Sequence, residues 1–372
     1  MYPSAAHHGP IVVPNVTKLC SHAILVTKDN ITSLHLPHLS PEDVNLYLGS
    51  GSSYTMLNRS RMRGIRNTGQ NDNIKALLTW LWDAVVGPVL NKLQLLTTKS
   101  SFPLPRIWWI GVGPMAHAPL HAAGRSRSES TLRFCIPLYT PSIRALMHAR
   151  AQAQDHVPNK FSKLSALMVS MPTTPGLGDL SGVQKEVDSI VGEFKKAGSV
   201  KIDTLSRPTA QVILEKLEGY SIIHFACHGI STENPADSHL VLSKPCTTPF
   251  LNGVYIEQAD KLRVRDIAAK RLQSGRLAFL SACSTAYNKA EHLADETTHM
   301  ASSFQIAGFH HVIGTLWPAD DDACVMMATE FYSSLLETDD VAVAYWNAIM
   351  KLRKFYRHGL TSSWAPFILL GA

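Results

Sequence analysis

Short apolar runs alternate with longer amphipathic segments along most of the chain. Apolar runs of about four to eight residues that end at Gly, Pro or polar residues are typical of buried strands, and apolar positions three or four apart indicate helices. We predict strands at 9–16, 21–28, 30–36, 106–112, 133–139, 165–171, 200–205, 220–227, 239–243, 276–283 and 310–317. We predict helices opened by Ser40-Pro41, over 71–96, 142–154, 182–198, 209–219 and 299–308, after Val264, and as two C-terminal helices ending near Arg357. Strands that alternate with helices predict an α/β fold with a largely parallel sheet.

Two features interrupt the alternation of strands and helices: a kink within one helix and a polar linker between two units. The segment 71–96 keeps apolar residues at helical spacing throughout, and Gly87-Pro88 predicts a kink within it. The polar stretch "AQDHVPNKFSK" is the best candidate for a boundary, because domain boundaries fall in polar, Pro-containing linkers. We therefore predict two units, 1–158 and 159–372.

Composition narrows the class of protein. The 372 residues are 45% hydrophobic, which supports sizeable cores, yet no run of eighteen apolar residues occurs. The start "MYPSAAHHGPIVV" does not resemble a signal peptide, so we expect a cytoplasmic protein that does not bind a membrane. The net charge of +6 is mild, and the Arg-rich stretch 58–72 is typical of a solvated loop, so nucleic acid is not expected as a partner.

The cysteines are scattered without CxxC pairs, which disfavours both a disulfide scaffold and a zinc ribbon. They are Cys20, Cys135, Cys227, Cys246, Cys283 and Cys324. A zinc site built from His224, Cys227 and His228 is also disfavoured, because successive strand residues point to opposite faces. For the same reason we expect Cys227 to be a packed thiol. We expect no metal and no organic cofactor.

Two predicted strands end in reactive side chains. "YSIIHFAC" runs into His228-Gly229, and "RLAFLSAC" ends at Cys283, which follows 55 residues later. In an open parallel sheet, ligands bind in the crevice beyond the carboxyl ends of the strands. If the two strands are parallel neighbours, His228 and Cys283 meet there.

The chemistry of this pair is that of a nucleophile and its base. An unperturbed thiol is only a few per cent thiolate at neutral pH, and an adjacent imidazole can take its proton and later return one to a leaving amine. Backbone N–H groups at Gly229 and Cys283 can face a developing oxyanion. Without the His-Gly partner, Cys283 would be more typical of a small buried hydrophobe, and it is the partner that favours catalysis.

The segments "IIHFACHGIS", "LAFLSACSTA" and "HHVIGTLWPADDDA" together resemble the CHAT peptidases of the caspase and separase clan. The resemblance extends to "RIWWIGVGPMAHAPLHAAG", "YTPSIRALMHARA", "MPTTPG" and the closing "SSWAPFILLGA". It implies a caspase-like three-layer α/β fold, in which a degenerate N-terminal lobe packs on an active C-terminal lobe. It also implies that His228 is the general base, that Cys283 is the nucleophile and that Gly229 and Cys283 form the oxyanion hole. The tryptophan-rich form of the pattern is most similar to fungal members.

Within this resemblance, His121 lies where an active lobe would keep its histidine, but no cysteine follows in the matching position. We therefore interpret the first half as an inactive counterpart. Ser284 replaces the acidic residue that often follows the cysteine, which bears on substrate preference.

The expected reaction is the cleavage of protein substrates through an acyl-enzyme, under the control of an upstream sensor or regulatory protein. Asp237, Asp320 or Asp321 could bind a basic substrate side chain, although carboxylates also favour the start of a helix for structural reasons. Two alternatives stay open. One is a catalytically silent protein-interaction module, and the other is a thiol-dependent hydrolase or acyltransferase that acts on small esters or amides.

Overall fold

The computed structural model describes most of the chain. The described residues are 5–49, 70–96, 103–155, 164–198, 201–232, 234–245, 257–270, 272–273, 275–281, 300–356 and 361–372. The predicted loop at 58–72 and the predicted unit boundary at 158–159 fall largely or wholly outside these residues, as does Cys283.

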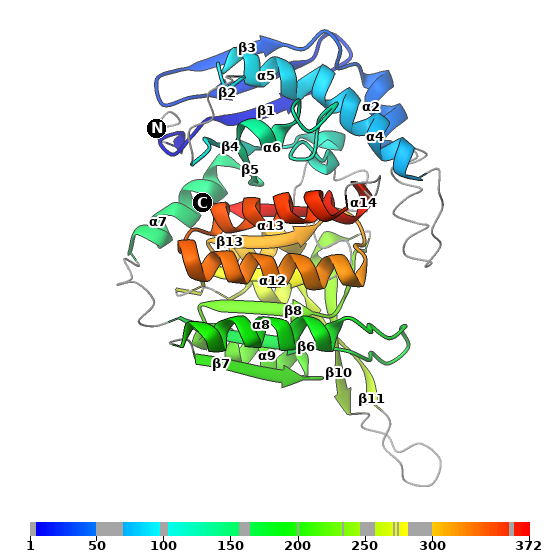
Figure 1. Cartoon of the computed structure of the whole chain (residues 1–372), viewed down its shortest axis with the longest axis vertical. Coiled ribbons are helices and arrows are strands. Elements are labelled where there is room, and N and C mark those ends of the chain that lie inside the picture. The colour runs from blue at the N-terminus through cyan, green and yellow to red at the C-terminus, as the bar shows by residue number, and fades with distance from the viewer. Residues whose placement is uncertain are drawn as a thin grey trace.

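One large sheet runs through the molecule (Figure 1). Its 11 strands follow the order β3-β2-β1-β4-β5-β14-β13-β12-β8-β6-β7. Neighbouring strands are parallel except at β3–β2, β2–β1 and β14–β13. The predicted α/β fold with a largely parallel sheet is therefore confirmed.

The first half of the chain supplies one end of this sheet. Its strands are β1 (Ile11–Asn15), β2 (His22–Val26), β3 (Ile31–His35), β4 (Arg106–Trp109) and β5 (Ile136–Tyr139). Its helices are α2 (Pro41–Leu48), α4 (Gln70–Leu81), α5 (Gly87–Lys92), α6 (Thr131–Phe134) and α7 (Ile143–Asp155), with a 3-10 turn η2 (Gly113–His117).

The second half supplies the other end. Its strands in the large sheet are β6 (Ser165–Ser170), β7 (Lys201–Ser206), β8 (Ile222–Ala226), β12 (Leu277–Ser281), β13 (His311–Thr315) and β14 (Phe367–Gly371). Its helices are α8 (Val183–Ala197), α9 (Ala210–Lys216), α10 (Val264–Ala268), α11 (Met300–Ile306), α12 (Asp321–Thr338), α13 (Val341–Phe355) and α14 (Thr361–Trp364), with 3-10 turns η3 (Leu217–Gly219) and η4 (Pro235–Asp237). A separate sheet combines β9 (His228–Ile230), β10 (His239–Pro245) and β11 (Glu257–Arg263).

Helices cover both faces of the large sheet, which makes three layers. Helices α8, α12 and α13 lie side by side on the face turned towards the viewer in Figure 1. The strand order returns from β7 to β8, then to β12 and β13, and because crossovers between parallel strands are almost always right-handed, we infer that α9, α10 and α11 cover the other face. Among the described residues, no helix is long and apolar enough to cross a membrane.

The predicted kink in the segment 71–96 takes the form of a π-helical turn. Residues Trp82–Val86 form this turn (η1), and α5 follows directly with Pro88 in its first turn. Proline has no N–H and its ring clashes with the carbonyl four residues earlier, so a regular α-helix cannot continue through Pro88. The wider turn accommodates the proline without ending the helix.

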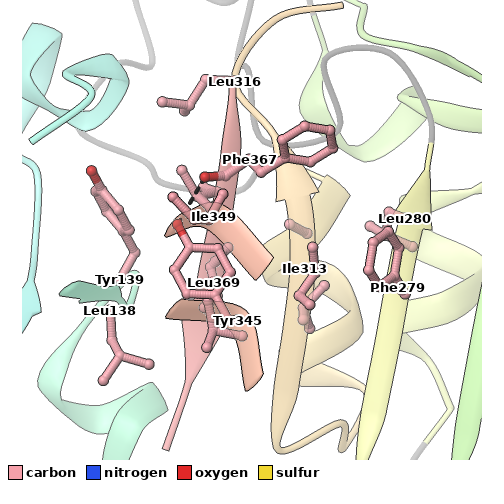
Figure 2. Packing of buried hydrophobic residues seen from close by; sticks show 14 of the residues in the cluster. Leu138, Tyr139, Phe279, Leu280, Ile313, Leu316, Tyr345, Ile349, Phe367 and Leu369 are labelled. Atoms are coloured by element: carbon pink, nitrogen blue, oxygen red, sulfur yellow. Dashed lines mark hydrogen bonds between the residues drawn. The ribbon is translucent and has the colours of Figure 1, made fainter. Parts of the chain in front are cut away.

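A continuous core joins the two halves of the chain at the middle of the sheet. Strand β14 lies between β5 and β13, and Leu370 pairs with Tyr139 across the junction. Figure 2 shows Tyr345 and Ile349 of α13 packed against this region, where the Tyr345 hydroxyl donates to the Phe367 carbonyl at 2.8 Å. Because these side chains are fully buried or nearly so, the two halves share one apolar core. The predicted division at 158–159 thus separates two ends of one sheet.

The structure corrects the strand predictions in three places. Strand β14 was not predicted, although "FILLG" is buried at every position, because a short fully apolar run does not distinguish a strand from a buried helical segment. The predicted strand 133–139 begins only at Ile136, since Arg133 and Phe134 belong to helix α6. Strands β9 and β11 are additional.

Candidate active site

The two strands that end near His228 and Cys283 are parallel neighbours, which meets the condition under which the two residues lie at one edge of the sheet. Strand β12 pairs with β8, and the register places Ser281 opposite Ala226 at the carboxyl ends of both strands. His228 lies two positions beyond Ala226, and Cys283 lies two positions beyond Ser281 in the sequence. The register therefore brings both strands to the same edge of the sheet, at the same level, two residues before His228 and two residues before Cys283.

A backbone carbonyl orients the His228 ring. The Nε2 atom of His228 lies 2.8 Å from the carbonyl oxygen of Gly178, which can only accept a hydrogen bond. The proton of the neutral ring is therefore on Nε2, and Nδ1 carries the free lone pair. A neutral imidazole with a free lone pair on Nδ1 is the form that a general base requires.

Gly178 belongs to the turn that follows β6. The Leu180 N–H donates to the Pro172 carbonyl at 2.8 Å, and the Leu177 N–H donates to the Thr174 carbonyl at 3.1 Å. Gly176 in the same turn has a φ of +78°, in the left-handed region that glycine tolerates best. The sequence indicated a Pro/Gly-rich turn here, but a contact made by a backbone oxygen has no side-chain signature, so its link to His228 was not predicted.

The His-Gly pair belongs to the smaller, three-stranded sheet. Strand β9 begins at His228, and its antiparallel pairing with β10 places Gly229 opposite Leu240 and His228 opposite Val241. Gly229 is buried, whereas His228 is partly exposed. The histidine thus lies at the junction of two sheets, with its ring accessible at the edge of the larger one.

Each of the three candidate substrate-binding aspartates makes contacts inside the protein. The Asp237 carboxylate lies 3.1 Å from Arg265 Nη1 and accepts from Asn234 Nδ2 at 2.9 Å. Asp320 precedes helix α12 and accepts from the Ser363 hydroxyl at 2.7 Å. Asp321 accepts from the Ser181 hydroxyl and from the Gly182 N–H, both at 3.1 Å.

Behind the carboxyl ends of the strands lies a small cavity of about 30 Å³. Its lining includes Glu186 of α8, Cys227, Ser281 and Asp321. The Ser281 hydroxyl is buried and has no hydrogen-bond partner among the described residues. A cavity of this size holds a water molecule or two, not the side chain of a lysine or arginine. Cys227, at 1% exposure, is buried as predicted.

His224 lies deeper in the same lobe, in a cluster that links three elements. Its Nε2 lies 3.1 Å from Glu186 Oε1, without the alignment of a hydrogen bond, and its Nδ1 lies 3.3 Å from the Tyr332 hydroxyl. Burial, followed by the nearby Glu186 charge, raises the pKa of Tyr332 well above its ordinary value, so the phenol stays protonated. With His224 itself at 0% exposure, the cluster joins α8, β8 and α12 and cannot reach a substrate.

Two further histidines, His121 and His311, have structural roles. His121 is fully buried, its Nδ1 lies 2.9 Å from the Tyr139 hydroxyl, and its Nε2 lies 3.0 Å from the Ala365 carbonyl. Burial lowers the pKa of His121 to about 3 and that of His311 also to about 3, so both are neutral at physiological pH. Within the described part of the chain, no three His, Cys, Asp or Glu side chains gather as metal ligands.

Solved structures share this architecture. Separase from Saccharomyces cerevisiae, solved in the separase–securin complex, matches with a TM-score of 0.63 at 12% identity, over 100% of this chain and 30% of that chain. The Arg-specific cysteine proteinase gingipain R matches with a TM-score of 0.51 at 12% identity, over 80% of this chain and 73% of that chain. The fold is therefore that of the caspase-like proteins.

Sequence comparison identifies the family within that class. The sequence model of the CHAT domain matches residues 75–372, so the chain belongs to the CHAT family. Tetratricopeptide repeat protein 28 is similar over 344 residues, with 24% identity for the Mus musculus protein and 25% for the Homo sapiens protein. The match covers 82% of this chain but only 13% of the length of those relatives.

Proposed function

We propose that this chain is a cysteine endopeptidase in which Cys283 is the nucleophile and His228 is the general base. The observation that carries the proposal is the register of β8 and β12, which ends the two strands at the same level of the sheet. In the sequence, His228 follows the last paired residue of β8 by two positions, and Cys283 follows that of β12 by two positions. The hydrogen bond from His228 Nε2 to the Gly178 carbonyl supports it, because this contact leaves Nδ1 free to take a proton. The proposal also agrees with the general position of ligand sites in parallel α/β sheets, beyond the carboxyl ends of the strands.

In the proposed reaction, the Cys283 thiol gives its proton to His228 Nδ1 and the sulfur attacks the carbonyl carbon of a peptide bond. The N–H groups of Gly229 and Cys283 stabilise the oxyanion that forms. The imidazolium then protonates the leaving amine as the C–N bond breaks, which leaves an acyl-enzyme. A water molecule that His228 deprotonates hydrolyses the thioester and restores the thiol.

We also propose a preference for substrates with a basic side chain at the cleavage site. A basic side chain at the cleavage site would bind at Asp321, Asp320 or Asp237, and each of these carboxylates would have to exchange one of its present hydrogen bonds or its ion pair for the substrate. An upstream sensor or regulatory protein as the partner, and a fungal source, also stay predictions.

Covalent labelling tests the nucleophile. We expect a mixture of peptidyl acyloxymethyl ketones, varied at the residue before the warhead, to modify the chain once, at Cys283, as measured by intact mass and peptide mapping. Cys283→Ala is expected to abolish the label. Cys20→Ala is the matched control, because Cys20 is an exposed thiol far from the site in sequence, and it should leave labelling unchanged. Labelling at Cys20 or Cys324 in place of Cys283 would contradict the proposal.

A further inference from the structure

Two hollows in the surface meet on the face that α12 and α13 cover. One, of about 570 Å³, lies between α12 and α13 and includes Ser334, Met350 and Lys354. The other, of about 560 Å³, lies between α4, the loop before α6 and α14, and includes Lys75 and Trp364. Both hollows are lined by Arg127 and Arg353, so together they form one groove that crosses from the second half of the chain to the first.

Arg353 is fixed in the floor of this groove. Its Nη1 donates to the Ser130 hydroxyl at 2.9 Å, and its Nη2 donates to the Ser126 carbonyl at 3.2 Å. Its guanidinium carbon lies 5.2 Å from the centre of the Trp364 ring, a cation–π distance. The positive charge is thus held in one place before any ligand arrives.

A second guanidinium lies beside it. Arg127 Nη2 donates to the Arg353 carbonyl at 2.9 Å in the last turn of α13. Burial first, and the neighbouring Arg127 charge second, lower the pKa of Arg353 to about 10, so the Arg353 guanidinium stays charged at neutral pH. The carboxyl end of a helix favours nearby cations, which accounts for part of this arrangement but supplies only a partial charge.

Neither arginine has a carboxylate partner in the described part of the chain. No described carboxylate oxygen lies within 4.0 Å of a side-chain nitrogen of Arg127, Arg353 or Lys354. The neighbouring cations differ, since Arg125 pairs with Asp83 at 2.7 Å and Lys351 pairs with Glu330. Within the described residues, the cations at the centre of the groove therefore have no carboxylate partner, whereas Arg125 and Lys351 beside them are paired.

We propose that this groove binds an acidic peptide segment of a partner protein. Carboxylate side chains of the segment pair with Arg127 and Lys354, and its apolar side chains contact Met350 and Tyr356. An extended chain fits because the two hollows continue into one another, whereas a single small anion would occupy only the junction. The apolar Met350 and the acidic Glu337 in the lining suit a segment whose charges alternate with apolar side chains better than a nucleic-acid backbone, which carries a negative charge on every nucleotide.

Fluorescence anisotropy tests this proposal with a fluorescein-labelled 12-residue peptide in which glutamate and leucine alternate. A peptide of the same length with glutamine in place of glutamate is the ligand control. We expect the full chain to bind the acidic peptide at low salt, at least tenfold more tightly than the neutral one, and to lose affinity as salt is added. The charge-reversed variant Arg127→Glu/Lys354→Glu is expected to weaken binding by at least tenfold.

The matched control variant is Lys28→Glu/Lys195→Glu, which makes the same change in net charge at exposed positions away from the groove. It should keep the affinity within about twofold of the wild type. Far-ultraviolet circular dichroism and the labelling of Cys283 check that both variants are folded. Equal binding of the two peptides, equal losses in the two variants, or binding of a labelled 12-nucleotide RNA in place of the acidic peptide would each overturn the proposal.

Discussion

Replacing His228 with alanine is expected to lower the rate of peptide cleavage by about 10²–10⁴-fold, the range that a general base contributes. Without the imidazole, the Cys283 thiol is only a few per cent ionised at neutral pH and the leaving amine has no proton donor. The rate would be measured with a mixture of fluorogenic peptides, at equal protein concentration and several pH values.

The exposed His148 on helix α7 offers a matched control, and His148→Ala should cleave at the wild-type rate. The far-ultraviolet circular dichroism of His228→Ala should equal that of the wild type, because the ring is partly exposed and donates only one hydrogen bond. A His228→Ala protein that is folded and cleaves as fast as the wild type would remove His228 from the mechanism.

The largest effect on stability is expected at Glu186. Glu186→Ala should lower the free energy of unfolding by at least about 2 kcal/mol, because it removes a fully packed side chain from the core and leaves a cavity beside the His224 ring. The carboxylate is only 3% exposed and lies 3.1 Å from His224 Nε2. Urea unfolding followed by tryptophan fluorescence measures the change.

Two variants of the same helix separate the causes of this effect. Glu186→Gln keeps the volume and removes the charge, so it should cost less than Glu186→Ala. Asp188→Ala changes an exposed carboxylate of α8 and should stay within about 0.5 kcal/mol of the wild type. If Glu186→Ala unfolds at the same urea concentration as Asp188→Ala, the cluster of Glu186, His224 and Tyr332 does not stabilise the lobe.

Much of the fold could be predicted because its strands are buried and its helices are amphipathic. The run "LAFLS" of β12 is buried at every position, and the helix opened by Ser40-Pro41 begins where expected, with the Ser40 hydroxyl accepting from the Asp43 N–H at 3.0 Å. Strand order and direction could not be read from such local patterns. The insertion of β14 between β5 and β13 depends on contacts between residues that are distant in the sequence.

The candidate active site, like the fold, could be predicted only in part. The two buried strands that run into His228 and Cys283 could be predicted, since a reactive residue after an apolar run is a local pattern, but their parallel pairing entered the prediction only as a condition. The Gly178 carbonyl could not, because every residue carries the same backbone oxygen and only the tertiary structure selects one. The contacts of the three candidate aspartates could not be predicted either, because their partners approach them only in the folded chain. The pairs are Asp237 with Arg265, Asp320 with Ser363 and Asp321 with Ser181.

The most direct test of a peptidase built on Cys283 compares the peptides that the purified wild-type chain and Cys283→Ala release from a whole-cell lysate. Mass spectrometry of new protein termini records both activity and the residue that precedes each cut. We predict that the wild type generates termini sharing a common preceding residue and that Cys283→Ala generates none of them. If the two proteins, both folded, give the same set of termini, Cys283 does not cleave proteins and the peptidase proposal is wrong.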